Sequence, residues 1–140
     1  MADVIYNSFK GKIMDGSIDL DTDTIKVALV TSSYTPNQDT HDFFNDVTNE
    51  VSGTGYTAGG ATIANDSVSV DNTDNEGVYD GDDVTWSSST ITARGAVIYK
   101  STGTASTSPL IAYLDFGSDQ SSSSGDFTIQ WNSEGILNLN

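Results

Sequence analysis

The spacing of apolar residues changes near residue 15, and this change predicts a helix followed by strands. Five apolar residues share one side of a helix drawn over residues 3–15: Ile5, Tyr6, Phe9, Ile13 and Met14. Asp3 is suited to cap the start of this helix, and Asp15-Gly16 is suited to end it. The apolar pattern beyond this point has a period of two, which is typical of β-strands.

Strand-like segments occupy much of the remaining chain. Each is rich in β-branched or aromatic residues or alternates between apolar and polar positions: residues 25–31, 67–70, 78–79, 84–86, 93–100, 110–116, 127–131 and 136–139. In the first of them, Ile25, Val27 and Leu29 share one face and Ala28 and Val30 the other. Because both faces are apolar, we expect this strand to be covered on both sides.

Two segments have the composition of loops. Residues 32–61 contain Pro36 and four glycines and predict an extended arm, which Phe43-Phe44 would anchor through a short helical turn. Residues 117–125 contain four consecutive serines and predict a flexible hairpin loop. The whole pattern predicts a mainly β fold over residues 1–140: a single-domain antiparallel β-sandwich or barrel with one short N-terminal helix.

The composition supports this fold class. The chain has 140 residues, with 19 Ser, 17 Thr, 10 Asn and 17 Asp but only 3 Glu. These short polar side chains bond their own backbone and favour turns and strands over helices. There is no cysteine, so disulfides, thiolate metal sites and cysteine nucleophiles are excluded.

The charge excludes two classes of partner. Five Lys and Arg oppose 20 Asp and Glu, which gives a net charge of −15. Nucleic acid and anionic membrane surfaces would both repel such a chain. The longest apolar runs are too short to span a bilayer, and the N-terminus has no pattern of a secretory signal.

The acidic residues contain one fragment of a metal-binding motif. Asp19, Asp21 and Asp23 have the spacing that opens a calcium loop, but the sixth position is Thr24 and the twelfth is Val30, where the motif needs Gly and Glu. Further acidic runs lie at 71–76 and 80–83. We therefore interpret these carboxylates as solvated turn residues and expect neither a metal nor another cofactor.

No set of residues predicts catalysis. His41 is the only histidine and is interpreted as the edge of a short turn. Trp86 and Trp131 lie in alternating segments that predict core positions rather than sugar platforms. The glycines near residues 53–60 lack the Lys that follows a phosphate-binding loop. We expect a protein that is not an enzyme.

Seven segments of the chain carry a resemblance to known proteins: residues 6–10, 18–30, 34–37, 82–86, 97–100, 108–113 and 127–131. Together they resemble small virion structural proteins of tailed bacteriophages, of the capsid decoration or cement type. The resemblance implies a compact β domain on the outside of the virion head, bound to the major capsid protein and present as a dimer or trimer. On this interpretation the surfaces for contact with the capsid or a partner include Tyr6, Phe9, Lys10, Tyr34, Pro36, Phe43 and Tyr56.

Two other functions remain open at this point. One is a tail, neck or fibre component, in which exposed Tyr34, Tyr56 and Tyr79 would contact a glycan. The other is a calcium-dependent carbohydrate-binding module. The net charge also leaves open whether electrostatics favours or opposes binding to the head. Crowded copies would repel one another, whereas a basic patch on the capsid would attract them.

Overall fold

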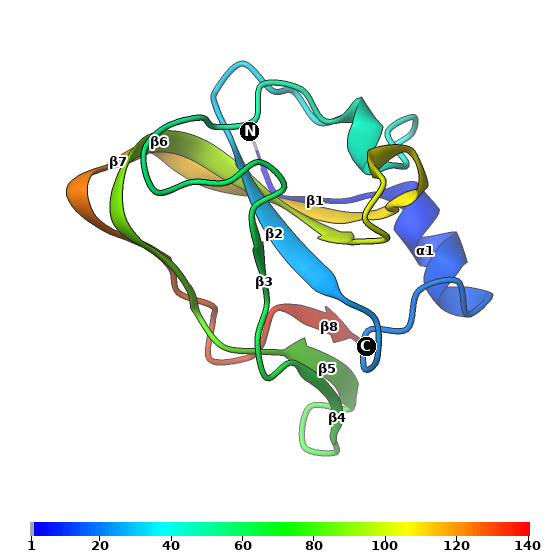
Figure 1. Ribbon diagram of the computed structural model, residues 1–140. Coiled ribbons are helices and arrows are strands. Elements are labelled where there is room, and N and C mark those ends of the chain that lie inside the picture. Colours follow the sequence, from blue (N-terminus) through cyan, green and yellow to red (C-terminus); the bar gives the residue numbers. More distant parts are fainter. Residues whose placement is uncertain (1) are drawn as a thin grey trace.

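The computed structural model describes residues 2–140, which form two antiparallel sheets, one α-helix and two short 3-10 helices (Figure 1). In chain order the elements are β1 (Val4–Ile5), α1 (Asn7–Met14), β2 (Ile25–Val30), η1 (Phe44–Asp46), β3 (Ala61–Thr62), β4 (Ser67–Asp71), β5 (Glu76–Asp80), β6 (Val84–Lys100), η2 (Ala105–Thr107), β7 (Leu110–Ile129) and β8 (Leu137–Leu139). The expected mainly β, sandwich-like single domain is confirmed, and the described residues form no closed barrel.

The larger sheet has the strand order β1-β7-β6-β2-β3 and is built around one long hairpin. Strands β6 and β7 pair from Val84 opposite Ile129 to Tyr99 opposite Leu110. Four irregularities in the register bend this hairpin, and the bend projects from the left of the molecule in Figure 1. The strands expected at 84–86 and 93–100 are therefore parts of one strand, as are those at 110–116 and 127–131.

The expectation of a flexible loop at residues 117–125 is wrong, because these residues belong to β7. Hydroxyl groups pair across the two strands here: Thr92 Oγ1 lies 2.8 Å from Ser121 Oγ, and Ser89 Oγ lies 2.7 Å from Ser122 Oγ. Serine runs are typical of loops, but in a strand each hydroxyl can find a partner on the neighbouring strand. This pairing depends on residues about thirty positions away, so the local composition did not indicate it.

The N-terminal helix is shorter than expected. It begins at Asn7 rather than residue 3, because Val4 and Ile5 pair with Tyr113 and Ala112 as strand β1. Asp3 does not cap the helix and instead accepts a hydrogen bond from the backbone N–H of Asp115, at 2.7 Å. The end of the helix at Asp15-Gly16 is confirmed, with Gly16 at a φ of 82°.

Strand β2 is covered on both sides, as its sequence predicts. Ile25, Val27 and Leu29 pack into the main core between the sheets, with Trp86 and residues of β6 and β7. Ala28 and Val30 pack into a second core, on the opposite face of the large sheet. We call this second cluster the tyrosine core, because it contains four tyrosines: Tyr6, Tyr34, Tyr99 and Tyr113.

Residues 32–61 pack onto the large sheet instead of extending away from the domain. The part around Phe44 and Val47 covers the tyrosine core, whereas Val51 and Tyr56 pack in the main core. The segment contains only the short helical turn η1, confirming the turn expected near Phe43-Phe44, and no strand of its own before β3. The Phe44 ring stacks on Tyr99 at 4.1 Å between ring centroids. The backbone N–H of Val51 donates to Leu29 of β2 at 2.9 Å. The expectation of an extended arm is therefore wrong, whereas its anchoring near Phe43-Phe44 is confirmed.

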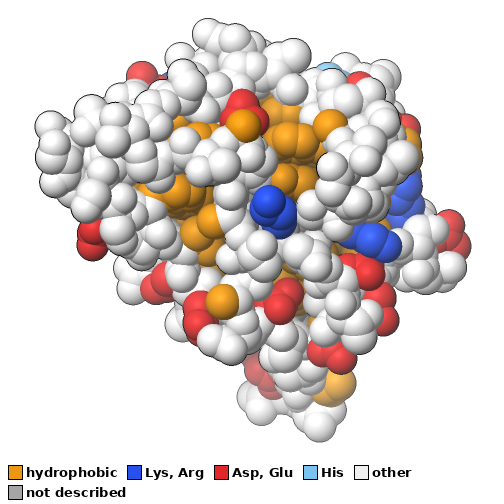
Figure 2. Space-filling model, viewed as in Figure 1, with side chains coloured by type: hydrophobic (Ala, Val, Ile, Leu, Met, Phe, Trp, Pro, Cys, Tyr) orange, Lys and Arg blue, Asp and Glu red, His pale blue; other side chains and the backbone are white. Residues whose placement is uncertain are grey.

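The smaller sheet has the strand order β4-β5-β8 and lies at the bottom of the molecule in Figure 1. Tyr79 of β5 and Leu137 of β8 connect this sheet to the main core. Of the two tryptophans expected in the core, Trp86 is buried, whereas Trp131 is half-buried and donates its indole N–H to the carbonyl of Asp82 at 2.8 Å. In the view of Figure 2, acidic side chains gather over this lower part of the molecule, and the bend of β6 and β7 carries few charges.

Candidate functional site

An apolar groove separates helix α1 from the small sheet. Its volume is about 620 Å³. One wall is α1 with the segment that follows it, and the other is formed by β4, β5 and β8. Six apolar or aromatic residues of its lining are Ile5, Phe9, Met14, Val68, Tyr79 and Leu139. We call this feature the α1 groove.

Buried residues form the floor of the α1 groove, and exposed apolar residues form its rim. Phe9 and Tyr79 are 7% and 2% exposed. Met14 is 87% exposed, Leu139 is 71% exposed and Val68 is 48% exposed. Large apolar side chains at such exposure form a patch that a soluble protein usually keeps for contact with another molecule. The rim is therefore the part of the surface best suited to binding.

Local sequence patterns place these side chains around the groove. Phe9 and Ile13 are four residues apart on α1 and so point the same way, toward the small sheet. In β8, Leu137 and Leu139 are two residues apart and share one face, and both line the groove. A period-four stripe and a period-two strand thus face each other across the groove.

Carboxylates surround the α1 groove more densely than cations do. Asp19 is in its lining, together with one cation, Lys10. Asp21 Oδ1 accepts a hydrogen bond from the backbone N–H of Val68 at 3.2 Å, and Glu76 Oε1 accepts one from Asn138 Nδ2 at 2.6 Å. These contacts hold both acids next to lining residues. The apolar rim is therefore set in a mostly negative surface.

Hydrogen bonds keep two of the nearby acids charged. The pKa of Asp19 is lowered, first by a hydrogen bond from the Thr22 side chain and then by the backbone N–H of Asp21. The pKa of Asp15 is lowered by hydrogen bonds from the side chain and backbone of Ser17. Both effects favour the ionised carboxylate. The negative charge beside the groove is therefore present well below neutral pH.

The three acids with calcium-like spacing do not converge on one point. Asp19 accepts a backbone hydrogen bond from Asp21, while Asp21 bonds Val68 on the small sheet. Asp23 accepts the backbone N–H of Asp19 at 2.8 Å and forms an ion pair with Lys100 at 3.0 Å. Each carboxylate is used in holding the segment before β2, which fits the interpretation of these acids as turn residues.

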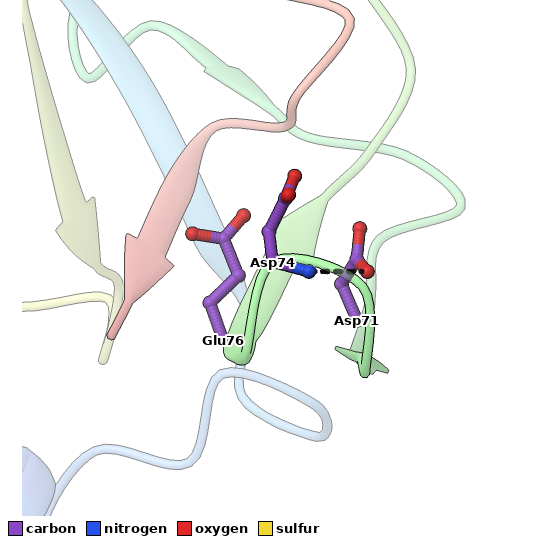
Figure 3. Close-up of side chains that lie close together, drawn as sticks. All are labelled: Asp71, Asp74 and Glu76. Atoms are coloured by element: carbon purple, nitrogen blue, oxygen red, sulfur yellow. Dashed lines mark hydrogen bonds between the residues drawn. The ribbon is translucent and has the colours of Figure 1, made fainter.

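Another acidic group gathers at the turn between β4 and β5 (Figure 3). Oxygen atoms of Asp71, Asp74 and Glu76 lie within 4.8 Å of one another. Asp71 Oδ1 accepts backbone hydrogen bonds from Thr73 at 2.8 Å and Asp74 at 3.2 Å, as is usual when Asp begins a turn. The turn itself thus accounts for the position of Asp71, within the run 71–76 that the sequence marks as an acidic turn.

The expected contact residues divide into accessible and buried ones. Phe9 and Lys10 both line the α1 groove, Phe9 at its floor and Lys10 exposed. Tyr6 is fully buried and Tyr34 is 3% exposed, so neither is available to a partner on the folded surface. The expectation for these two tyrosines is wrong because their hydroxyls bond each other, at 2.8 Å, inside the tyrosine core.

The remaining expected contacts are half-buried and lie away from the groove. Pro36 and Phe43 are in the segment that covers the tyrosine core, where the Lys12 ammonium lies 4.8 Å from the centroid of the Phe43 ring. Tyr56 donates its hydroxyl to Glu50 at 2.6 Å and accepts the backbone N–H of Leu29 at 2.9 Å. Of the seven expected contact residues, Phe9 and Lys10 line the α1 groove and the other five do not.

The three tyrosines considered for glycan contact are not exposed. Tyr34 and Tyr79 are buried, and Tyr56 is half-buried. The Tyr79 hydroxyl donates to Asp66 at 2.7 Å. Burial, together with this hydrogen bond, raises the pKa of Tyr79. Each of these rings is part of the internal structure, so the expectation of a tyrosine platform is wrong.

His41 lies at the edge of the tyrosine core. Its Nδ1 is 2.9 Å from the Tyr34 hydroxyl and accepts the backbone N–H of Asn37 at 3.2 Å. The His41 and Tyr34 rings stack, with centroids 5.7 Å apart. These contacts close the turn at residues 37–41 over the sheet, which agrees with the interpretation of His41 as a turn residue.

The rim of the α1 groove could not be recognised from the sequence pattern. Val68 and Leu139 lie in segments correctly expected to be strands, but alternation shows only that these side chains share a face, not whether that face is covered. Met14 was placed on the apolar side of the helix, where it is in fact 87% exposed. The acidic residues nearby were the one available signal that this face meets solvent.

Among residues 2–140 no helix has both the length and the apolar character needed to cross a membrane. No family model, curated protein or solved structure matches the chain.

Proposed function

We propose that this chain is a non-enzymatic structural protein of a tailed-bacteriophage virion, which binds the outside of the head and stabilises it. The observation that supports a docking role is the α1 groove, an open apolar surface surrounded by charge. The assignment to a virion rests on the resemblance of seven sequence segments to decoration proteins. The proposed partner is the major capsid protein, and copies of the chain associate as dimers or trimers on the head.

The proposed mechanism is stabilisation by mass action. A protein that binds only the assembled lattice stabilises each site by RT ln(1 + [L]/Kd), or about 2.7 kcal/mol when its free concentration is 100 times Kd. Many equivalent sites on one head add their contributions.

The contacts of the titratable side chains support a function without catalysis. His41, Asp19 and Asp23 each form hydrogen bonds or an ion pair that hold the fold.

The test is to locate and count the chain in purified particles. Particles from cells that carry the gene are separated into heads and tails, and the chain is quantified by mass spectrometry against the major capsid protein. We expect it in the head fraction, in a copy number comparable to that of the capsid protein. Heads prepared without the chain should open at a lower temperature and recover when the purified chain is added back.

Two results would contradict the proposal. Recovery of the chain in the tail or fibre fraction, at a small fraction of the capsid copy number, would assign it to the tail, neck or fibre. Heads whose opening temperature is the same with and without the chain would exclude a stabilising role.

A further inference from the structure

The exposed large apolar side chains of residues 2–140 are concentrated at one place. Five are exposed: Ile5, Met14, Val68, Val70 and Leu139. Four of these line the α1 groove, although they come from β1, α1, β4 and β8. The fifth, Val70, lies just outside it on β4 and lines a separate, polar depression. Because four separate elements contribute one such residue each, the patch is a product of the fold and not of one apolar stretch of sequence.

The groove is deep enough to hold side chains. Its volume of about 620 Å³ lies within the range of 300–1,000 Å³ that is typical of ligand pockets. Its floor is apolar, and Phe9 and Leu20 beneath it are buried in the main core. An occupant would therefore need apolar side chains to fill it.

The charges around the groove indicate which residues should flank the apolar part of an occupant. Asp19 lies in the lining, Asp21 is bonded to Val68, and Glu76 is bonded to Asn138. Asp15 immediately follows Met14 in the chain. Among the described residues that line the groove, Lys10 is the one cation. Basic residues on either side of an apolar segment would meet these carboxylates, which favours such a partner in both association rate and orientation.

We propose that the α1 groove binds a short apolar segment of a partner protein that is flanked by Lys or Arg. A second copy of this chain is a poor occupant, because it would bring another net charge of −15 to an acidic rim. The inference rests on the proposed docking function and adds to it the surface used and the chemistry of the partner segment.

The first measurement uses the full chain and synthetic peptides as probes. Peptides with several different six-residue cores of Leu, Ile and Val are made in three forms, flanked by Lys, by Ser or by Glu, and their binding is followed by fluorescence anisotropy. We expect saturable binding of Lys-flanked peptides, at least about tenfold tighter than that of their Glu-flanked forms. This binding should weaken as salt is added.

The second measurement compares two matched variants, Val68→Lys and Val70→Lys. Both replace an exposed valine on β4 and change the net charge equally, but only Val68 lines the groove. We expect Val68→Lys to weaken peptide binding by about tenfold or more and Val70→Lys by no more than about twofold. Circular dichroism checks that each is folded, and Leu139→Lys replaces Val68→Lys if that variant is not.

Three peptide-binding results would overturn the inference. They are the absence of saturable binding by any Lys-flanked peptide, equal binding of all three flanked forms, and equal loss in the two valine variants. A dimer in analytical ultracentrifugation that Val68→Lys abolishes and Val70→Lys preserves would also overturn it, in favour of a second copy as the occupant.

Binding to heads separates this inference from the proposed function. If Val68→Lys decorates purified heads as well as the wild type does, the groove inference fails and the decoration function stands. If the wild type is absent from heads but binds Lys-flanked peptides through the groove, the decoration function fails and the chemistry of the groove stands.

Discussion

The tyrosine core and the α1 groove are both apolar surfaces, but the chain covers only the first. Part of residues 32–61 lies over the tyrosine core, so that Tyr6 and Tyr34 are almost completely buried. No segment of residues 2–140 covers the groove in the same way, and Met14 and Leu139 remain exposed at its rim. Burial of the first surface stabilises the fold, whereas the second is left available to another molecule.

Hydrogen bonds explain why the tyrosine core can be covered by a loop. A loop brings many backbone polar groups, each of which needs a partner when buried. Here the hydroxyls of Tyr6 and Tyr34 bond each other, and that of Tyr99 donates to the carbonyl of Gly59. The α1 groove offers few such partners in its lining, so it suits apolar side chains better than a covering loop.

The largest expected effect is the loss of the fold at alkaline pH. All six tyrosines have a raised pKa, which for Tyr99 is about 12, and burial is the first cause in each case. In the unfolded chain the tyrosine pKa is about 10. Their contribution to stability is therefore complete below about pH 10. Above this pH it falls by about 1.4 kcal/mol per pH unit for each tyrosine that stays neutral in the fold.

Absorbance at 295 nm and far-UV circular dichroism test this together. We expect the tyrosines to ionise in the same transition in which the β structure is lost, above pH 10. A parallel titration in denaturant should show ordinary ionisation near pH 10. Ionisation of most tyrosines near pH 10 with the fold intact would show that the tyrosine core is not sealed.

The next largest effect is expected for Gly60→Ala, where the covering segment returns to β2. Gly60 has a φ of 78°, and a Cβ there would lie 1.9 Å from the carbonyl oxygen of Val27. The left-handed backbone at this position and the clash with the Val27 carbonyl should together lower the free energy of unfolding by about 3 kcal/mol or more, measured by urea denaturation. Gly11→Ala on α1 is the control, since its Cβ meets nothing within 4 Å and should stabilise the helix by about 0.5–1 kcal/mol. A Gly60→Ala protein as stable as the wild type would contradict the close packing of this segment.

A smaller difference is expected between Tyr34→Phe and Tyr6→Phe. Without the Tyr34 hydroxyl, the fully buried Tyr6 hydroxyl loses its partner, which should cost about 1–3 kcal/mol. In Tyr6→Phe the Tyr34 hydroxyl keeps His41 Nδ1 at 2.9 Å, so the cost should be nearer to about 1 kcal/mol. Thermal or urea unfolding of both variants measures the difference. Equal costs would mean that His41 does not support Tyr34.

The smallest effect on stability is expected at the rim of the α1 groove. Met14 and Leu139 make little buried contact, so Met14→Gln and Leu139→Ser should each change the free energy of unfolding by no more than about 0.5 kcal/mol. Phe9→Ala, at the floor, is the contrasting variant and should cost about 3 kcal/mol or more. If the rim variants were as costly as Phe9→Ala, the groove would be part of the core and not an open surface.

The local patterns of the chain determined most of its elements. A run that is apolar on both faces placed β2 and predicted that both its faces are covered, while Asp15-Gly16 marked the end of α1. Periodicity and turn residues are local properties, and they can be recognised without knowledge of the fold. The mainly β class and the short accessory helix follow from the same signals.

Contacts between distant residues decided the rest. Residues 121–124 became part of β7 because this segment pairs with β6, which also offers partners to the hydroxyls of Ser121 and Ser122. The segment around Phe44 became a cover because the tyrosine core lies beneath it. Met14, Val68 and Leu139 form one rim only after four elements meet. A residue's periodicity sets which way it points relative to its neighbours, whereas its exposure depends on what the folded chain places in front of it. The sequence by itself therefore determined most of the strands and the helix end, and only the tertiary structure decided which apolar face stays open.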